Sequence, residues 1–344
     1  MSMRVWRVWM NSAFSSVATA LGLIREGDLE GRFHTIYSHP HAHSAAAGVA
    51  DAFHVEPSGL AAAEYVDWCL AFCREQRVDV FMPSKHAAAL SAARGRFLEQ
   101  GTRLLSAALP AQLDLIDDKA AFYAAVDLPQ APAPQFREFS DIEQFDAAHA
   151  ALRARHDTLC VKPSRSVYGL GFSVLDEQRS SAALLLAGAS YRIGLADLRR
   201  GLAELGQFRS MLLMEYLDGP EYSVDCVGDE GRLVCLVARK KLPQAGHGQL
   251  IDMRPDIAAA CAKLAADFGL NGMFNVQFRE GRDGLRLLEI NPRMSGGIGM
   301  ACLAGPNLPY IALRGFVDGH AGLTPAPVRD GMRVGEQGCA LELA

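Results

Sequence analysis

Apolar positions in the first third of the chain fall into two alternating patterns. Short apolar runs predict strands, and longer runs with apolar residues along one side predict helices. The predicted strands are Met3–Met10, His34–Ser38, Val78–Met82 and Arg103–Leu105, and the predicted helices are Val17–Glu26, Leu60–Gln76 and Ala87–Leu98. This alternation favours a small parallel sheet with helices on both faces.

The carboxyl ends of the predicted parallel strands form the first candidate site, because ligands gather there in such sheets. The segments 11–16 and 83–86 each follow a strand, so they are candidate substrate contacts. Ser12 and Ser84 could equally cap the helices that follow. For each serine taken alone, the cap is the favoured interpretation.

The chain changes character after a proline-rich segment. A helix is predicted over Leu113–Asp127, and the three prolines of Leu128–Pro134 then mark a linker. Ser140–Glu143 opens another helix with a capping-box pattern. Further helices are expected within 180–206 and 257–268, and strands over Thr158–Lys162, Phe172–Leu175, Ser210–Leu217, Glu221–Val227, Arg232–Lys241, Met273–Arg279 and Leu287–Asn291.

The last two of these strands carry the strongest candidate chemistry. Glu280–Gly284 joins them as a hairpin. Alternate side chains of a strand share a face, so Glu289 and Asn291 point one way, while Leu288 and Ile290 form an apolar backing. If odd residues pair across the hairpin, Asn275 and Gln277 join them. Oxygen donors without thiols or imidazoles suit Mg²⁺.

A solvated hairpin face is the alternative interpretation of Glu289 and Asn291, and for these two residues alone the odds are nearly even. The residues that follow favour a site. Pro292 ends the strand, and the planar Arg293 guanidinium suits a phosphate or a carboxylate. Ser295, Gly296 and Gly297 complete the segment.

A lysine within an apolar strand is a second candidate. Lys162 closes the strand Thr158–Lys162, where burial is costly unless the lysine meets an anion. The loop Ser164–Gly171 could close over phosphates through its backbone N–H groups, or be an ordinary hairpin turn. Arg239, Lys240 and Lys241 could face the same anion or form a solvated strand edge.

Composition narrows the class of protein. With 344 residues the chain can form two or three domains, and 34 Lys and Arg against 39 Asp and Glu give a net charge of −5. The absence of a basic block argues against nucleic acid as a partner. No apolar run approaches the roughly 20 residues of a membrane span. The sequence has no Gly-x-x-x-x-Gly-Lys-Ser/Thr motif of P-loop proteins, no Gly-x-Gly-x-x-Gly dinucleotide motif after the first strand and no Gly-x-Ser-x-Gly motif of hydrolases.

Cysteines and histidines add little chemistry. The eight cysteines lie scattered in apolar runs without a Cys-x-x-Cys pair, which indicates reduced core thiols and a cytoplasmic protein. Arg4 and Arg7 before an apolar stretch resemble an export signal, but a strand followed by a helix explains them better. His39, His41 and His43 could hold a metal, although a polar loop is favoured because no clear fourth ligand is nearby.

Four segments together resemble the ATP-grasp superfamily, over about Leu113 to Asp318. They are Lys119, residues 160–171 (CVKPSRSVYGLG), residues 212–225 (LLMEYLDGPEYSVD) and residues 274–297 (FNVQFREGRDGLRLLEINPRMSGG). The resemblance implies two α+β lobes that clasp the nucleotide, preceded by a small parallel α/β domain. The domains would be 1–110 and 111–344, the latter with a smaller lobe at about 135–217, a larger lobe at about 218–325 and a short tail.

The resemblance also implies roles for residues. Lys119 and Lys162 would contact the phosphates of ATP, and the loop with Ser164, Gly169 and Gly171 would cover them. Glu215, Tyr216 and Leu217 would line the adenine pocket, and Glu221 would hold the ribose. Mg²⁺, with Mn²⁺ as the alternative ion, would be bound by Gln277, Glu289 and Asn291. Arg293 and Lys162 would be the catalytic residues.

The activity implied is that of an ADP-forming ligase. A carboxylate would attack the γ-phosphate of ATP, and an amine would capture the acyl phosphate, so the partners are a small carboxylate and a small amine. Activation of bicarbonate and nucleotide binding without catalysis are the alternatives. Many members of the family carry an acidic residue where Gln277 stands, which leaves the number of metal ions open. The pair Gln277-Phe278 followed by Glu289-x-Asn291-Pro292-Arg293 resembles the carbamoyl-phosphate-synthetase-like branch of the superfamily. A homodimer is expected only because dimers are common.

Overall fold

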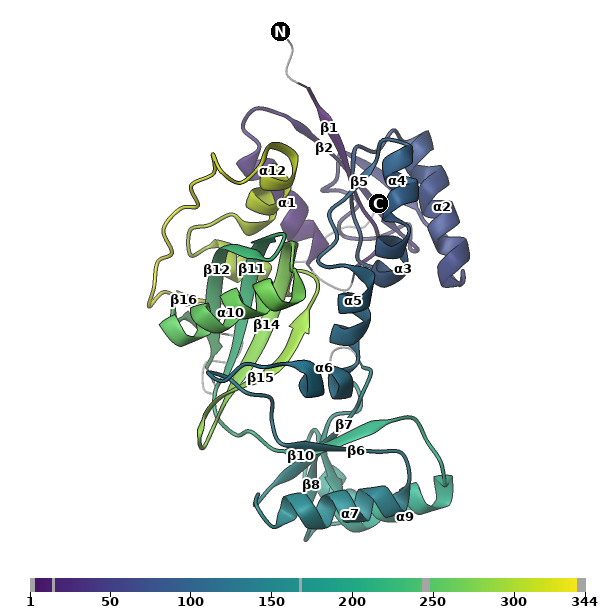
Figure 1. Cartoon of the computed structure of the whole chain (residues 1–344), viewed down its shortest axis with the longest axis vertical. Helices are drawn as coiled ribbons and strands as arrows, with labels where there is room; N and C mark the ends of the chain where they lie inside the picture. The colour runs from purple at the N-terminus through teal and green to yellow at the C-terminus, as the bar shows by residue number, and fades with distance from the viewer. Residues whose placement is uncertain (1–3, 14–15, 167–168, 243–247, 339–344) are drawn as a thin grey trace. The chain divides into compact units, whose positions relative to one another are not determined.

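The computed structural model describes residues 4–13, 16–166, 169–242 and 248–338 (Figure 1). The chain divides into two compact units. Unit 1 comprises Met1–Asp114, Pro220–Phe278 and Glu289–Ala344, and unit 2 comprises Leu115–Gly219 and Arg279–Leu288. Of the predicted features, residues 14–15 in the segment after the first strand and residues 167–168 in the Ser/Gly loop lie outside the described residues.

The N-terminal sheet of unit 1 is parallel, as predicted, with the order β3-β2-β1-β4-β5, and it contains one strand, β3, that was not predicted. Its strands are β1 (Trp6–Met10), β2 (Phe33–His39), β3 (Ala52–Val55), β4 (Val80–Met82) and β5 (Arg103–Leu104). Its helices are α1 (Val17–Gly27), α2 (Ala62–Glu75), α3 (Ala87–Ala92) and α4 (Arg94–Glu99). The helix predicted over Ala87–Leu98 is thus two short helices that meet at Ala93.

This strand order brings the ends of β1 and β4 side by side. The Asn11 carboxamide oxygen accepts a hydrogen bond from the Ser84 amide at 2.7 Å. The Ser12 hydroxyl donates to Glu56 at 2.6 Å. Neither Ser12 nor Ser84 caps a helix, because α1 and α3 begin after Ser16 and His86. The helix-cap interpretation of these serines was therefore wrong, and both residues belong to the polar network at the end of the sheet.

The second sheet of unit 1 has the order β15-β14-β11-β12-β13-β16. Its strands are β11 (Glu221–Asp229), β12 (Arg232–Lys241), β13 (Gln249–Ile251), β14 (Gly272–Gly281), β15 (Gly284–Asn291) and β16 (Arg333–Val334). The helices around it are α10 (Pro255–Phe268), α11 (Ile298–Cys302) and α12 (Leu308–Asp318). The tip of the β14–β15 hairpin, Arg279–Leu288, belongs to unit 2.

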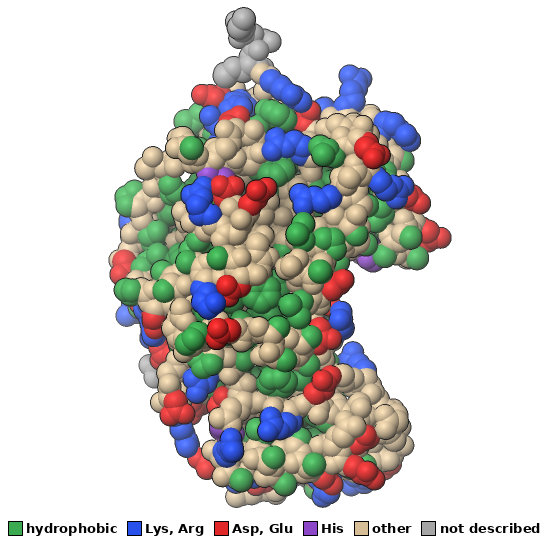
Figure 2. Space-filling model, viewed as in Figure 1, with side chains coloured by type: hydrophobic (Ala, Val, Ile, Leu, Met, Phe, Trp, Pro, Cys, Tyr) green, Lys and Arg blue, Asp and Glu red, His purple; other side chains and the backbone are tan. Residues whose placement is uncertain are grey.

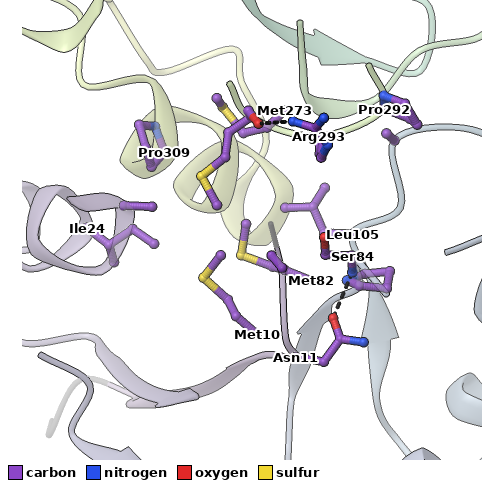
Figure 3. A pocket seen from close by; sticks show the side chains of 15 residues that line it. Met10, Asn11, Ile24, Met82, Ser84, Leu105, Met273, Pro292, Arg293 and Pro309 are labelled. Carbon is purple, nitrogen blue, oxygen red and sulfur yellow. Dashed lines mark hydrogen bonds between the residues drawn. The ribbon is translucent and has the colours of Figure 1, made fainter. Parts of the chain in front are cut away.

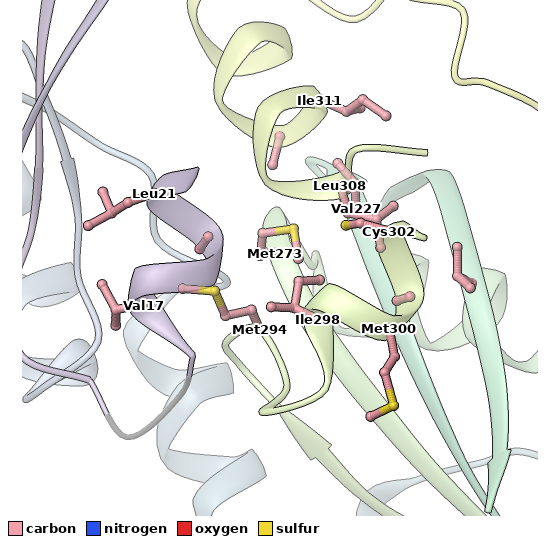
Figure 4. Close-up of a cluster of buried hydrophobic side chains, with 14 of the residues drawn as sticks. Val17, Leu21, Val227, Met273, Met294, Ile298, Met300, Cys302, Leu308 and Ile311 are labelled. Atoms are coloured by element: carbon pink, nitrogen blue, oxygen red, sulfur yellow. The ribbon is translucent and has the colours of Figure 1, made fainter. Parts of the chain in front are cut away.

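One hydrophobic core joins the two sheets of unit 1. Val17 and Leu21 of α1 pack in the same cluster as Met294, Ile298 and residues of α12 (Figure 4). Helices α1 and α12 lie side by side in this core (Figure 1). Because the cluster includes residues before and after Arg293 in the chain, it fixes the backbone that carries Arg293 within unit 1.

Unit 2 contains a sheet of order β6-β10-β7-β8-β9. Its strands are β6 (Phe136–Phe139), β7 (Leu159–Pro163), β8 (Ser173–Asp176), β9 (Arg192–Gly194) and β10 (Met211–Glu215). Helices α7 (Ile142–Arg153), α8 (Ser181–Leu186) and α9 (Leu195–Leu205) accompany it, and α7 and α9 lie along one face (Figure 1). The helical stretch expected within 180–206 is interrupted by β9. Helix α7 is capped by Asp141, whose carboxylate accepts a hydrogen bond from the Gln144 amide at 2.8 Å.

The helix predicted over Leu113–Asp127 is also divided, into α5 (Pro110–Asp117) and α6 (Lys119–Ala125). Asp118 separates them because its carboxylate accepts from the amides of Ala120 and Ala121, as an N-cap does. This break places Lys119 at the first position of α6.

The distribution of charged side chains on the surface agrees with the nearly balanced numbers of basic and acidic residues in the sequence. On the face drawn in Figure 2, basic and acidic side chains are interspersed. Within the described residues, no helix combines the length and the apolar character needed to cross a lipid bilayer.

Candidate active site

Lys162 lies on β7 in unit 2, and its ammonium group is held by a tyrosine that the sequence did not point to. Lys162 Nζ donates to the hydroxyl of Tyr123 at 2.8 Å and lies 4.9 Å from the centre of the Tyr123 ring. The Tyr123 hydroxyl in turn donates to the carbonyl of Leu288 on β15. Lys162, which we predicted to meet an anion because it lies in an apolar strand, is thus half-buried. Its orientation is set by Tyr123 of α6, which is itself bound to the β14–β15 hairpin.

Lys119 is linked to the Ser/Gly loop. Its side chain is buried and Nζ donates to the carbonyl of Ser166 at 2.8 Å, while its amide donates to the carbonyl of Ser164 at 3.0 Å. The Ser164 hydroxyl donates to Asp118 at 2.7 Å. Burial raises the pKa of Asp118, but hydrogen bonds from Ser164 and the helix amides, together with the charge of Arg165, outweigh burial and lower the pKa below its ordinary value.

The end of the same loop needs glycine. Gly169 and Gly171 have φ angles of 67° and 80°, in the left-handed region that other residues rarely adopt. A Cβ atom on Gly171 would lie 2.8 Å from the Pro163 ring, so a side chain there would also collide with the end of β7. Of the predicted loop residues, Gly169 and Gly171 thus have backbone conformations that favour glycine.

Glu215 ends β10, and its carboxylate already has several partners. It accepts from the Gln135 amide at 2.7 Å and lies 3.6 Å from both His156 and Arg286. The Tyr216 amide donates to the Thr158 carbonyl at 3.1 Å, and Leu217 is buried. The three residues predicted to contact adenine thus lie at the end of β10 and just after it, close to Gly219, where this segment of unit 2 ends. The Glu215 side chain contacts Gln135, His156 and Arg286.

In unit 1, two of the three residues predicted to bind metal form a hydrogen-bonded row with Arg293, which was predicted to bind phosphate. Arg293 donates to the Asn291 carboxamide oxygen at 3.1 Å, and the Asn291 amide donates to Glu289 at 3.1 Å. This confirms that Glu289 and Asn291 share one side of β15. Leu288, however, is half-buried, whereas Leu287 and Ile290 are buried. The expectation that Leu288 belongs to the apolar backing was therefore wrong: the buried residues are Leu287 and Ile290, because the burial alternation of β15 shifts by one residue between them.

The oxygen donors fit a magnesium ion by their chemistry. Glu289, Asn291 and the half-buried Gln277 of β14 offer one carboxylate and two carboxamides, the hard donors that Mg²⁺ prefers. In the part of the chain that the structure describes, no group of three or more histidine, cysteine, aspartate or glutamate side chains could hold a metal. The three histidines at 39, 41 and 43 therefore form no such group there.

A buried network behind this row was not predicted. The carboxylate of Asp225 is fully buried and pairs with Arg239 at 2.7 Å, and Ser295 donates to Asp225 at 2.9 Å. Asn275 donates to Asp225 at 3.2 Å and to Ser223 at 3.0 Å, so its described hydrogen bonds lead to β11. Arg239 is thus not at a solvated strand edge, and the anion that it faces is the buried carboxylate of Asp225. Ser223 and Arg239 are paired in the β11–β12 hairpin, a register that the sequence did not reveal because it shifts between Val227 and Gly228.

The first residue of β11 is also paired. Glu221, predicted to hold a ribose, forms an ion pair with Lys241 at the end of β12. Both side chains are partly exposed, which distinguishes this pair from the buried pair of Arg239 and Asp225. Lys240 lies on the other side of β12, 3.9 Å from Asp252.

A cavity of about 50 Å³ lies within unit 1 beside Arg293 (Figure 3). It adjoins the ends of β1 and β4, so Asn11, Pro83 and Ser84 of the two predicted substrate segments line it. Glu56, which directly follows the unpredicted β3, fixes this end of the sheet. Its carboxylate has no exposed surface and accepts from Ser12, Ser38 and Tyr65.

Comparison with known proteins found one matching family model and several relatives with similar sequences. A family described as "ATP-grasp in the biosynthetic pathway with Ter operon" matches residues 207–338. Carnosine synthase 1 of Gallus gallus is 35% identical over 127 residues, which are 32% of this chain and 13% of that protein. The carbamoyl phosphate synthase large chain of Corynebacterium glutamicum is 27% identical over 219 residues, 60% of this chain and 18% of that protein. The chain thus spans less than a fifth of these two relatives.

Solved structures support the fold. The ADP complex of PurK, N5-carboxyaminoimidazole ribonucleotide synthetase, matches with a TM-score of 0.67 and 16% identity, over 96% of this chain and 81% of that one. At this identity the likeness concerns the fold alone. The predicted fold class, a parallel α/β sheet followed by two α+β sheets, is confirmed.

Proposed function

We propose that this chain, which belongs to the ATP-grasp superfamily of ATP-dependent ligases, activates a small carboxylate with ATP and joins it to an amine, releasing ADP and phosphate. The observation that carries the proposal is the row of Arg293, Asn291 and Glu289 on one side of β15, joined by hydrogen bonds of 3.1 Å. It sets one cation beside a carboxylate and an amide, the groups needed for a phosphate and its metal.

The reaction proposed has two steps. A carboxylate oxygen of the substrate bonds to the γ-phosphorus while the bond to the bridging oxygen breaks, and ADP leaves with that oxygen. The amine nitrogen then bonds to the acyl carbon, phosphate leaves, and the amine loses a proton to solvent. Phosphoryl transfer depends chiefly on positioning and charge neutralisation, so fixed cations are the main requirement on the protein.

The chain's own residues divide this work. In unit 2, Lys119 and Lys162 neutralise the phosphates, the loop from Ser164 to Gly171 excludes water from the acyl phosphate, and residues 215–217 contact adenine. In unit 1, Glu221 holds the ribose and Arg293 stabilises the transferred phosphoryl group. Gln277, Glu289 and Asn291 hold Mg²⁺, which supplies further neutralisation of phosphate charge when bound.

Nucleotide products test the proposal. The purified chain is incubated with MgATP and a panel of carboxylates and amines, and the nucleotides are separated by ion-exchange chromatography. We expect ADP and phosphate to form only when both a carboxylate and an amine are present. Formation of AMP and pyrophosphate, or tight ATP binding without turnover across the panel, would overturn it.

Activation of bicarbonate is the second candidate. It is favoured by the alignment of 219 residues with the large chain of carbamoyl phosphate synthase. In this case ADP release would depend on bicarbonate and need no organic acid, so the same assay with bicarbonate as the only carboxyl compound separates the two functions.

A further inference from the structure

The cavity beside Arg293 has an unusual lining. Four of its side chains are methionines, and each comes from a different segment: Met10 from β1, Met82 from β4, Met273 from β14 and Met294 from the segment after β15. In Figure 3 the side chains of Met10, Met82 and Met273 lie around a common space. Methionine side chains are flexible and polarisable, so such a lining adapts to apolar groups of different shape.

The polarity of the lining is one-sided. Of the fifteen lining residues, Arg293 is the only one with a charged side chain, and it lies beside the apolar space (Figure 3). Asn11 and Ser84 add polar groups, and Asn11 is held by its hydrogen bonds to the Ser84 amide, to Tyr65 and to the Lys85 carbonyl. An anion with an apolar tail matches this arrangement, whereas an ammonium group would be repelled by Arg293.

We infer that this cavity binds the apolar part of the carboxylate substrate, with the carboxylate toward Arg293, and that the substrate is therefore an aliphatic acid with a short chain. The inference rests on the proposed function, whose substrate class it narrows. A water molecule needs about 10 to 15 Å³ of such space, so a cavity of about 50 Å³ accepts roughly three to five heavy atoms. Bicarbonate would leave the cavity unused.

Binding can be measured without turnover. The protein is labelled with ¹³C at the methyl groups of its eleven methionines, and each signal is assigned by substitution. Acetate, butanoate and octanoate are then titrated, each with and without a non-hydrolysable MgATP analogue. Butanoate is expected to shift the signals of Met10, Met82, Met273 and Met294 at lower concentration than acetate or octanoate. Butanamide, which lacks the charge, is expected to bind more weakly.

Met300 is the matched control. It belongs to the same hydrophobic cluster, is 5% exposed compared with 8% for Met273, and does not line the cavity. Its signal is expected to stay unchanged in all titrations. Met273→Ala should move the preference toward longer acids, by about fourfold for each added methylene that becomes buried, and Met300→Ala should not.

The outcomes separate the inference from the function on which it rests. Shifts at the four lining methionines support the inference even if no acid and amine pair releases ADP, which would defeat only the ligase proposal. Absence of these shifts, both with and without the nucleotide analogue, overturns the inference whether or not ADP is released. An equal shift at Met300 would also overturn it, because the acid would then act on the whole core.

Discussion

At the scale of single residues, Glu289 is the most informative position, because it is the carboxylate proposed to bind Mg²⁺. Its carboxylate is half-buried and accepts from Asn291 at 3.1 Å. Glu289→Ala should lower kcat/KM for ADP release by about a hundredfold or more, since loss of one preorganised charge partner has effects of that order. The free energy of unfolding should change by less than about 1 kcal/mol, because the site is not a packed core position.

A carboxylate on the same hairpin provides the control for Glu289. Asp283 lies at the tip, and its side chain is 87% exposed. Asp283→Ala should leave both ADP release and unfolding by urea unchanged. Equal activity of Glu289→Ala and Asp283→Ala would remove Glu289 from the proposed site.

The buried pair of Asp225 and Arg239 is expected to act on folding first. Asp225→Ala leaves a guanidinium that is 2% exposed without its carboxylate, and such a loss costs about 3 to 5 kcal/mol. The double variant Asp225→Leu with Arg239→Met removes both charges and should be more stable than Asp225→Ala. Urea unfolding of the three proteins measures this. A double variant that is less stable than Asp225→Ala would show that the other hydrogen bonds of Arg239 stabilise the fold as much as its pair with Asp225 does.

Residue contacts could be predicted from the sequence only where they are local. Strand alternation predicted that Glu289 and Asn291 share a side, because these residues are two positions apart. Tyr123 lies 39 positions from Lys162, and Glu56 lies 44 positions from Ser12. Such contacts depend on how elements pack, which hydrophobic patterning does not specify. The predicted roles of the site residues stay predictions.

At the scale of elements, the end of α12 depends on a glycine. A Cβ atom on Gly315 would lie 2.0 Å from the ring of His320, which is 9% exposed and folds back on the helix. Gly315→Ala should therefore lower the free energy of unfolding by about 1 to 3 kcal/mol through overpacking. Gly22 in α1 has no atom within 4 Å of such a Cβ, so Gly22→Ala should raise stability by about 0.5 to 1 kcal/mol. Opposite signs in urea unfolding are the expected result, and equal effects would contradict the packing at Gly315.

An ion pair that depends on pH links the same helix to Arg32, the residue just before β2. Arg32 donates two hydrogen bonds to Asp318, at 2.8 and 3.0 Å, and these hold the pKa of Asp318 below its ordinary value. A lowered carboxylate pKa stabilises the fold above the unfolded pKa, and this contribution disappears as the pH falls through the folded pKa. Asp318→Asn should thus cost about 1 kcal/mol between about pH 5 and pH 7, and less below about pH 3.8.

Asp114 is the control for the pH series, because it is exposed and no ion pair of Asp114 occurs in the described residues. Asp114→Asn should have the same stability as the parent chain at every pH. If the cost of Asp318→Asn stayed constant down to the lowest pH at which the protein folds, the pair with Arg32 would not be its cause.

Elements were predictable where the pattern was long. β1, β2, α2 and α10 follow clear apolar periodicities and were predicted within a few residues. The four residues of β3 and the three of β9 are mostly half-buried or exposed, so they carry no alternation that a sequence could reveal. The break before α6 was missed because a single Asp118 side chain caps the helix within an otherwise helical pattern.

At the scale of the whole molecule, the fold is retained with little sequence identity. The chain matches the PurK structure with a TM-score of 0.67 at 16% identity. Alternation of strands and helices was sufficient to predict the parallel sheet, because hydrophobic periodicity survives substitutions that erase identity, whereas the two sheets that follow were expected from the family resemblance. The substrate was not predictable, since the cavity beside Arg293 is lined by residues from distant segments.

The central claim is that a carboxylate oxygen attacks the γ-phosphate, and an isotope experiment tests it most directly. A substrate acid labelled with ¹⁸O in its carboxylate is turned over with MgATP and amine, and the released phosphate and nucleotide are analysed by mass spectrometry. One ¹⁸O atom is expected in each phosphate molecule and none in the nucleotide. Unlabelled phosphate, or ¹⁸O found in AMP, would contradict the claim.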